Sequence, residues 1–155
     1  MSAPGKPDSI SCRGFSLLEL LLVMALAGML AALVVPSLTG TLESARLRGS
    51  AGEVRAALTL ARTLAVSEAR GRFVDFDLGK GEYGVSGDAR KWLLPDGISL
   101  SSIRLGSAEA ERGIVRIRFY PDGSADEAEV AISSAAGGSR RVSVDPLTGI
   151  STEGT

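Results

Sequence analysis

The sequence predicts an α+β protein, in which one long N-terminal helix packs on antiparallel β-sheets. Residues 15–35 form a continuous apolar run, and residues 54–65 carry apolar side chains at helical spacing. After Gly71 the pattern changes to alternation with a period of two, interrupted by turns that contain glycine and proline. A helical stretch followed by several short strands is typical of the α+β class.

The apolar run reads FSLLELLLVMALAGMLAALVV and has a length typical of a transmembrane helix. At about 1.5 Å of rise per residue it spans the roughly 30 Å hydrocarbon core of a bilayer. Glu19 is its only ionisable residue, and no residue from Leu20 to Val35 is polar. Because a carboxylate is costly inside a membrane, Glu19 is a candidate functional residue.

Residues 1–14 form a polar leader before the apolar run, whereas a secretory signal peptide is cleaved after such a run. A cut after Gly14 would keep the helix in the mature protein. The order Arg13-Gly14-Phe15, Glu19, apolar run and Pro36 resembles the type III signal of type IV pilins and type II secretion pseudopilins.

This resemblance implies that prepilin peptidase cleaves between Gly14 and Phe15 and that the new N-terminus, Phe15, is methylated. It also implies that Glu19 pairs with the N-terminal amine of a neighbouring subunit during assembly and thereby sets the register. The alternative for Glu19 is that its side chain only reaches back to the lipid headgroups.

Residues 36–71 are expected to continue the helix as an amphipathic segment that enters the globular domain. Pro36 predicts a kink, and Gly71 is a C-cap signal. Leu38, Leu42 and Ala45 resume helical spacing, although glycines between 40 and 52 weaken it. The clearest stripe, expected to pack on a sheet, consists of Val54, Ala57, Leu58, Ala61, Leu64 and Ala65.

Residues 72–155 are expected to form a β-rich domain of about seven short strands. The expected strands are residues 72–78, 82–86, 91–94, 98–103, 114–120, 129–133 and 140–144. Residues 106–113 are polar and predict a mobile loop, and the turn at residues 145–149 is expected to end the sheet region.

Two segments, Phe119–Ser124 and Val142–Gly149, resemble the C-terminal hairpins of the GspH/FimT-like group of minor pilins and pseudopilins. The resemblance implies an H-type minor pseudopilin, a structural subunit of the type II secretion pseudopilus that helps to export folded proteins. The alternative is a FimT-like minor type IV pilin, which acts in pilus assembly or DNA uptake.

The same resemblance implies a single-pass protein of the inner membrane with its C-terminal domain in the periplasm of a Gram-negative cell. The implied partners are the other major and minor pseudopilins, prepilin peptidase and the inner-membrane assembly platform. The polar leader has a net positive charge, which weakly favours a cytoplasmic N-terminus.

The composition argues against an enzyme. The chain has no histidine, and its single cysteine, Cys12, lies in the leader. The mature protein would therefore lack a disulfide, a thiol nucleophile and the commonest general base. No cofactor is expected.

Two acidic groups were weighed as calcium ligands: Asp75 with Asp77, and Asp122 with Asp126 and Glu127. Their spacing does not match the C-terminal calcium loop of the major pseudopilin that the resemblance would imply, so a solvated strand face and a polar turn are preferred and no metal site is predicted.

Five arginines near the C-terminal strands were weighed as a DNA-binding stripe. They are Arg112, Arg116, Arg118, Arg140 and Arg141. Acidic residues alternate with them, and loss of the leader lowers the net charge from −1 to −2 because the leader carries +1. Nucleic-acid binding is therefore not expected.

Overall fold

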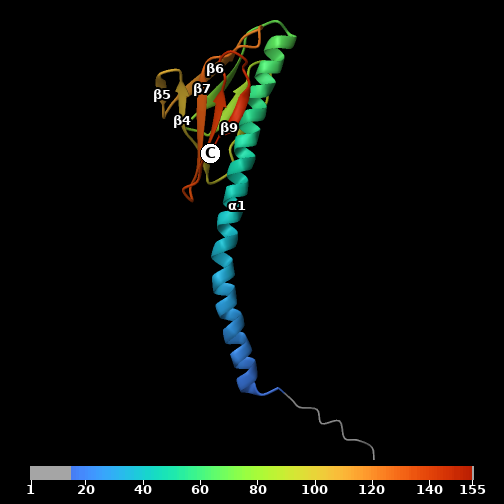
Figure 1. The fold of residues 1–155 in the computed structure, drawn as a ribbon, viewed down its shortest axis with the longest axis vertical. Coiled ribbons are helices and arrows are strands. Elements are labelled where there is room, and N and C mark those ends of the chain that lie inside the picture. The colour runs from blue at the N-terminus through green and yellow to red at the C-terminus, as the bar shows by residue number, and fades with distance from the viewer. Residues whose placement is uncertain (1–14, 155) are drawn as a thin grey trace, which may run out of the picture. The chain divides into compact units, whose positions relative to one another are not determined.

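The computed structural model describes the backbone of residues 15–154, and the side chains of that range except those of residues 31–39 and 41. In this part of the chain one helix precedes nine strands. Figure 1 shows the helix and the strands that follow it. The helix is α1 (Leu17–Ser67). The α+β prediction is confirmed. The strands form two antiparallel sheets, and there are nine of them where about seven were expected.

Helix α1 begins at a serine cap and is assigned as one continuous helix through Pro36. The Ser16 Oγ accepts a hydrogen bond from the backbone N–H of Leu18, at 3.3 Å, as an N-cap side chain does. The kink predicted at Pro36 stays a prediction, since its side chain lies outside the described set.

The helix ends earlier than predicted, at Ser67, and its C-cap is Ala69 where Gly71 was expected. Ala69 has a φ of 49°. The N–H of Arg70 donates to the carbonyl of Ala65, and the N–H of Ala69 donates to that of Val66. This bonding is the Schellman pattern, whose left-handed position usually holds glycine. The expectation for Gly71 was wrong because the hydrogen bonds close two residues earlier.

The predicted helical stripe between Val54 and Ala65 is confirmed. Its six apolar residues are buried, except for Leu64, which is half-buried. Burial starts at Leu47 and continues through Ser50 and Ala51. The earlier residues Leu42 and Ala45, which continue the helical spacing, are exposed. They form helix as predicted, but the stripe that packs on the sheets does not include them.

The first sheet has four antiparallel strands in the order β3-β2-β1-β6. The strands are β1 (Arg72–Asp77), β2 (Glu82–Val85), β3 (Lys91–Leu93) and β6 (Ile114–Phe119). Buried residues alternate along β1, β2 and β6, so one face of this sheet meets the core and the other faces outward.

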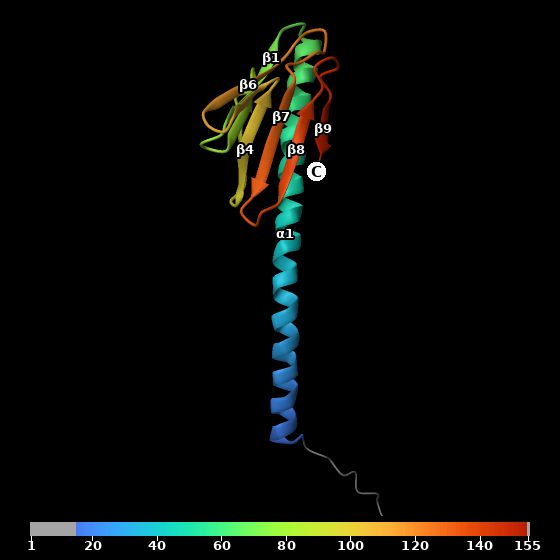
Figure 2. The ribbon, with the colours of Figure 1, turned by 60° about the vertical axis from the view of Figure 1, so that its left-hand side comes forward.

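The second sheet has five antiparallel strands in the order β5-β4-β7-β8-β9, and Figure 2 shows β4, β7, β8 and β9 side by side. The strands are β4 (Ile98–Leu105), β5 (Ala108–Ala110), β7 (Ala128–Ser134), β8 (Ser139–Val144) and β9 (Ser151–Gly154). One core contains buried side chains from both sheets and from helix residues 47–65.

Two strands lie where none was predicted. β5 occupies part of the expected loop 106–113, and β9 follows the turn that was expected to end the sheet region. Neither has the alternating apolar pattern of a half-buried strand. Each forms because a tight turn returns the chain along an existing edge, that of β4 for β5 and that of β8 for β9.

Candidate functional site

The N-terminal part of α1 exposes apolar side chains on every side. From Phe15 to Leu30 every residue is exposed, including Phe15 at 83% and Leu17 at 78%. A helix that is apolar all round is ordinarily buried in a large core or in a membrane. This segment therefore contrasts with residues 47–65, which bury one side in the protein's own core.

Glu19 lies in the first turn of α1 and is exposed. It is three residues after the capping Ser16, the Ser-x-x-Glu spacing of a capping box. A carboxylate in the first turn also interacts favourably with the helix dipole. The position of Glu19 therefore favours a helix start at Ser16, a signal that the Ser-x-x-Glu spacing carries in the sequence itself.

The structure gives part of the geometry of the predicted processing site. Phe15 is exposed directly before the helix, whereas Gly14 lies outside the described residues. Cleavage after Gly14, methylation of Phe15 and an assembly role of Glu19 stay predictions. Within the described residues, no helix satisfies the length and hydropathy criteria for crossing a membrane. The transmembrane assignment of residues 15–35 stays a prediction.

Arg62 joins α1 to the two turns that carried the family resemblance. Its Nε donates to the carbonyl of Thr148 at 2.7 Å and to that of Gly123 at 3.3 Å. The two turns also bond to each other, through the N–H of Ala125 and the carbonyl of Pro146 at 3.0 Å. This Arg62 junction, made of Arg62 and the turns at 120–125 and 145–149, attaches the helix to both hairpins.

Gly149 is required at this junction for two reasons. Its φ is 62°, in the region that glycine adopts most readily. An added Cβ would also overlap the carbonyl oxygen of Gly123 and lie 3.0 Å from the Cδ of Arg62. The turn is further held by Asp145, whose Oδ1 accepts bonds from the N–H of Thr148 and its hydroxyl at 2.8 and 2.9 Å.

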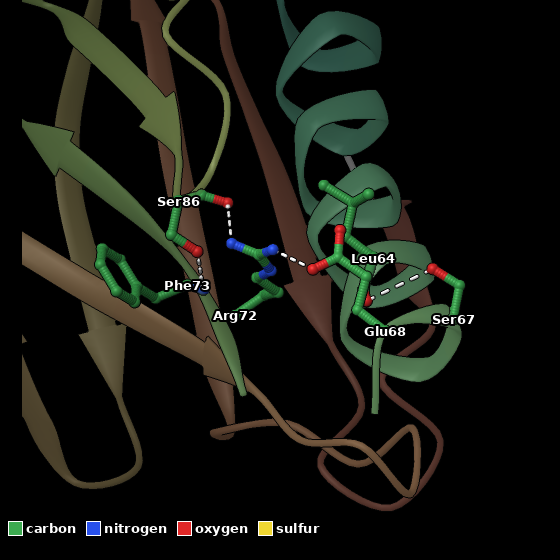
Figure 3. Close-up of polar contacts among 6 residues, drawn as sticks. All are labelled: Leu64, Ser67, Glu68, Arg72, Phe73 and Ser86. Atoms are coloured by element: carbon green, nitrogen blue, oxygen red, sulfur yellow. Dashed lines mark hydrogen bonds and ion pairs between the residues drawn. The ribbon is translucent and has the colours of Figure 1, made fainter. Parts of the chain in front are cut away.

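A second arginine attaches the last turn of α1 to the first sheet, as Figure 3 shows. Arg72 pairs with Glu68, the residue directly after the helix, and donates to the carbonyl of Ser86 at 3.1 Å. The hydroxyl of Ser86 accepts a bond from the N–H of Phe73 at 2.9 Å. Neither arginine was predicted to have this role. The carbonyl partners of Arg62 lie 61 and 86 residues away, whereas Glu68 and Ser86 lie 4 and 14 residues from Arg72.

The candidate calcium ligands are bonded to the protein itself. Asp75 forms two bonds with Arg116, at 2.6 and 2.8 Å, and Asp126 accepts from the hydroxyl of Tyr120. The Oδ1 of Asp122 accepts from Ser124, which holds the pKa of that carboxyl below its usual value. Among the described residues, no group of three or more acidic, histidine or cysteine side chains could hold a metal ion.

The arginines weighed for DNA binding do not form one stripe. Arg116 and Arg118 lie on β6 in the first sheet, whereas Arg140 and Arg141 lie on β8 in the second. Three of them pair with carboxylates: Arg116 with Asp75, Arg140 with Glu153 and Arg141 with Glu129. Much of their charge is therefore compensated within the domain.

A comparison with protein families identifies the family of the globular domain, which contains the Arg62 junction. The family model described as Type II transport protein GspH matches residues 50–148. The chain belongs to this family. A second model, the prokaryotic N-terminal methylation motif, matches residues 10–35 and thus includes the predicted cleavage site and Glu19. The predicted GspH/FimT-like relationship is confirmed.

Two solved structures share the fold of this GspH-family chain, and both are of the type IV minor pilin FimU of Pseudomonas aeruginosa PAO1. In one, the sequences are 21% identical, with a TM-score of 0.53 and coverage of 70% of this chain and 93% of FimU. In a second crystal form the sequence identity is 22% and the TM-score is 0.55, and the match covers 73% of this chain and 91% of FimU. No curated protein matches the sequence. Family and fold are those of pilin-like structural proteins.

Proposed function

We propose that this protein is a minor pseudopilin, a structural subunit of the type II secretion pseudopilus. The observation that carries the proposal is the exposed apolar helix of residues 17–30 with Glu19 in its first turn, in a chain of the GspH family. Such a helix needs an apolar environment that the chain does not provide for it. The membrane supplies that environment before assembly, and the helices of other subunits supply it afterwards.

In this proposal prepilin peptidase cleaves after Gly14 and Phe15 becomes the methylated N-terminus. Residues 15–35 cross the inner membrane once, and the C-terminal domain lies in the periplasm. The partners are the other pseudopilins and the assembly platform. No cofactor takes part.

The helical glycines support packing against other subunits. An added Cβ at Gly28, Gly40, Gly49 or Gly52 would meet no atom within 4 Å. Glycine costs about 1 kcal/mol relative to alanine inside a helix, and at these positions no close contact with other described parts of the chain compensates for that cost. Small residues allow two helices to approach closely, which gives these glycines a use in an assembled filament.

Processing is tested first, by mass spectrometry of the protein from cells that contain the cognate peptidase. The expected mature chain begins at methylated Phe15, and Gly14→Val should retain the leader. A mature N-terminus near residue 36 would show that the apolar run is a conventional signal peptide and would contradict the proposal.

Assembly is tested with Glu19→Ala. We expect a chain that is cleaved and membrane-bound but forms fewer crosslinks to other pseudopilins, with reduced secretion, because a neighbouring N-terminal amine loses its carboxylate. Ser16→Ala is the matched control, since it removes the cap bond but keeps the carboxylate. If both variants reduce crosslinking equally, the role of Glu19 is to start the helix.

The alternative is a minor type IV pilin, and the likeness to FimU leaves it open because that likeness shows the fold alone. Deleting the gene distinguishes the two. Loss of secretion with normal piliation supports the pseudopilin, and loss of piliation or DNA uptake with normal secretion supports the pilin. The paired arginines on β6 and β8 do not favour DNA uptake.

A further inference from the structure

A groove of about 270 Å³ lies between helix α1 and the strands β2 and β3. It is lined by Glu53, Ala56, Ala57, Leu60, Tyr83 and Trp92. The volume corresponds to several water molecules or one long side chain. The accessible lining is apolar apart from the carboxylate of Glu53, so the groove suits a ligand with an apolar stem and one polar end.

The aromatic side of the groove is held in place by stacking. The rings of Phe76, Tyr83 and Trp92 follow one another across β1, β2 and β3, with centroids 5.7 and 5.8 Å apart. The guanidinium of Arg90 lies 5.5 Å from the centroid of Trp92, and Asp88 fixes Arg90 through bonds of 2.8–3.1 Å. The ring of Trp92 is therefore positioned before any partner arrives.

Tyr83 has a polar atom that the described residues leave unsatisfied. The side chain is only 2% exposed, and its hydroxyl forms no hydrogen bond with any described residue. A buried hydroxyl without a partner typically costs about 1–3 kcal/mol. Burial, followed by the nearby charge of Glu53, raises the pKa of Tyr83 to about 12, so the phenol keeps its proton.

Glu53 gives the groove its charge. It is exposed on α1, and among the described residues it takes part in no ion pair, in contrast to Glu68, Glu129 and Glu153. A cation entering the groove would meet this carboxylate, whereas the oxygen of Tyr83 is buried. Its aliphatic stem would contact Ala56, Leu60 and Trp92, as lysine and arginine stems do on apolar surfaces.

We propose that this groove receives a lysine or arginine side chain from a neighbouring pilin-like subunit. The proposal rests on the function proposed above, because it assigns a partner contact to a filament subunit. Glu53 binds the cation, and the edge of the Tyr83 ring forms part of the apolar wall. Trp92, Leu60 and Ala56 bind the stem. The groove thus adds a side contact, in the globular domain, to the assembly of the apolar helices.

The chemistry of the groove is tested with the full chain in detergent. Trp92 is the only tryptophan of the chain, so its fluorescence reports on the groove directly. The probes are the peptide acetyl-Ala-Leu-Lys-Leu-Ala-amide and the same peptide with norleucine for lysine, which keeps the stem and lacks the ammonium. We expect the lysine peptide to bind roughly two- to fivefold more tightly, as for an exposed ion pair.

Glu53→Gln should abolish that preference, whereas Glu111→Gln, the same charge change outside the groove, should preserve it. Tyr83→Phe should keep the preference for the lysine peptide and raise the midpoint of thermal unfolding, because it removes a buried, unsatisfied hydroxyl. Equal binding of the two peptides, or an unchanged preference in Glu53→Gln, would overturn the proposal. A lowered unfolding midpoint in Tyr83→Phe would show that the hydroxyl already has a partner within the chain.

The assignment to a neighbouring subunit is tested in cells with the same variants. Glu53→Gln should reduce crosslinking from position 60 to other pilin-like subunits while cleavage and membrane insertion remain normal. Normal crosslinking with a confirmed peptide preference would overturn the assignment to a subunit. If the peptides show no preference but Glu19→Ala still blocks assembly, the groove proposal fails and the proposed function stands.

Discussion

Residues 17–30 and residues 47–65 belong to the same helix, yet the first segment exposes its apolar side chains and the second buries them on one side. In the first segment every side chain is exposed, and leucines follow one another on all sides. In the second, apolar residues recur at helical spacing, and the buried side meets both sheets. The comparison teaches that hydrophobicity alone does not say where a helix is buried, whereas the angular distribution of its apolar residues does.

The largest expected difference between the two segments is in the stability of the domain. Leu58→Ala removes a fully buried side chain and should lower the free energy of unfolding by about 2–5 kcal/mol. Leu20→Ala, the same change in the exposed segment, should alter it by less than about 0.5 kcal/mol. Denaturation followed by the fluorescence of Trp92 measures both. Equal losses would show that residues 17–30 contribute to the core.

The next largest effect on stability is expected at the Arg62 junction, which attaches the second segment to the hairpins. Gly149→Ala and Gly106→Ala both place alanine at positive φ, 62° and 55°, at a cost of roughly 1–2 kcal/mol. Only at Gly149 does the new Cβ overlap other atoms, whereas at Gly106 nothing lies within 4 Å. We expect Gly149→Ala to cost about 1–3 kcal/mol more. A loss no larger than that of Gly106→Ala would mean that the junction readily rearranges.

A smaller effect, of opposite sign, is expected at the helical glycines. Gly49→Ala should raise the free energy of unfolding by up to about 1 kcal/mol, because the position is exposed and has room for a Cβ. The nearby exposed Ala45→Gly is the reverse control and should lower it by a similar amount. If Gly49→Ala stabilises the chain but reduces crosslinking to other subunits, the glycine serves assembly.

The smallest effect concerns pH. Bonds from Thr148 and Leu147 hold the pKa of Asp145 below its usual value. A carboxyl whose pKa is lower in the folded state stabilises it above the unfolded pKa, and this contribution disappears as pH falls through the folded pKa. Stability should therefore fall as the pH drops below about 4, the ordinary pKa of an aspartate, and less steeply in Asp145→Asn. Hydrogen bonds also lower the pKa values of Asp122 and Asp88, so part of the dependence of stability on pH should remain in this variant. An identical slope in Asp145→Asn would show that this turn does not contribute.

Local patterns predicted the elements that depend on neighbours in the chain. The helical stripe from Val54 to Ala65 has the structure expected, and β1 to β3 lie within a residue of their predicted bounds. The family followed from Gly14-Phe15, Glu19 and the two C-terminal turns, and the match over residues 50–148 confirms it. These features are visible because helix spacing, strand alternation and turn residues repeat over a few positions.

The tertiary structure alone decided the features that join distant residues. Nothing near Arg62 in the sequence indicates carbonyl partners 61 and 86 residues away. The strands β5 and β9 form on edges that exist only once β4 and β8 are in place. The burial of the Tyr83 hydroxyl, which has no partner among the described residues, likewise depends on the packing of α1 against β2 and β3. Sequence periodicity predicts which side of an element is apolar. Which element packs on that side depends on the tertiary structure.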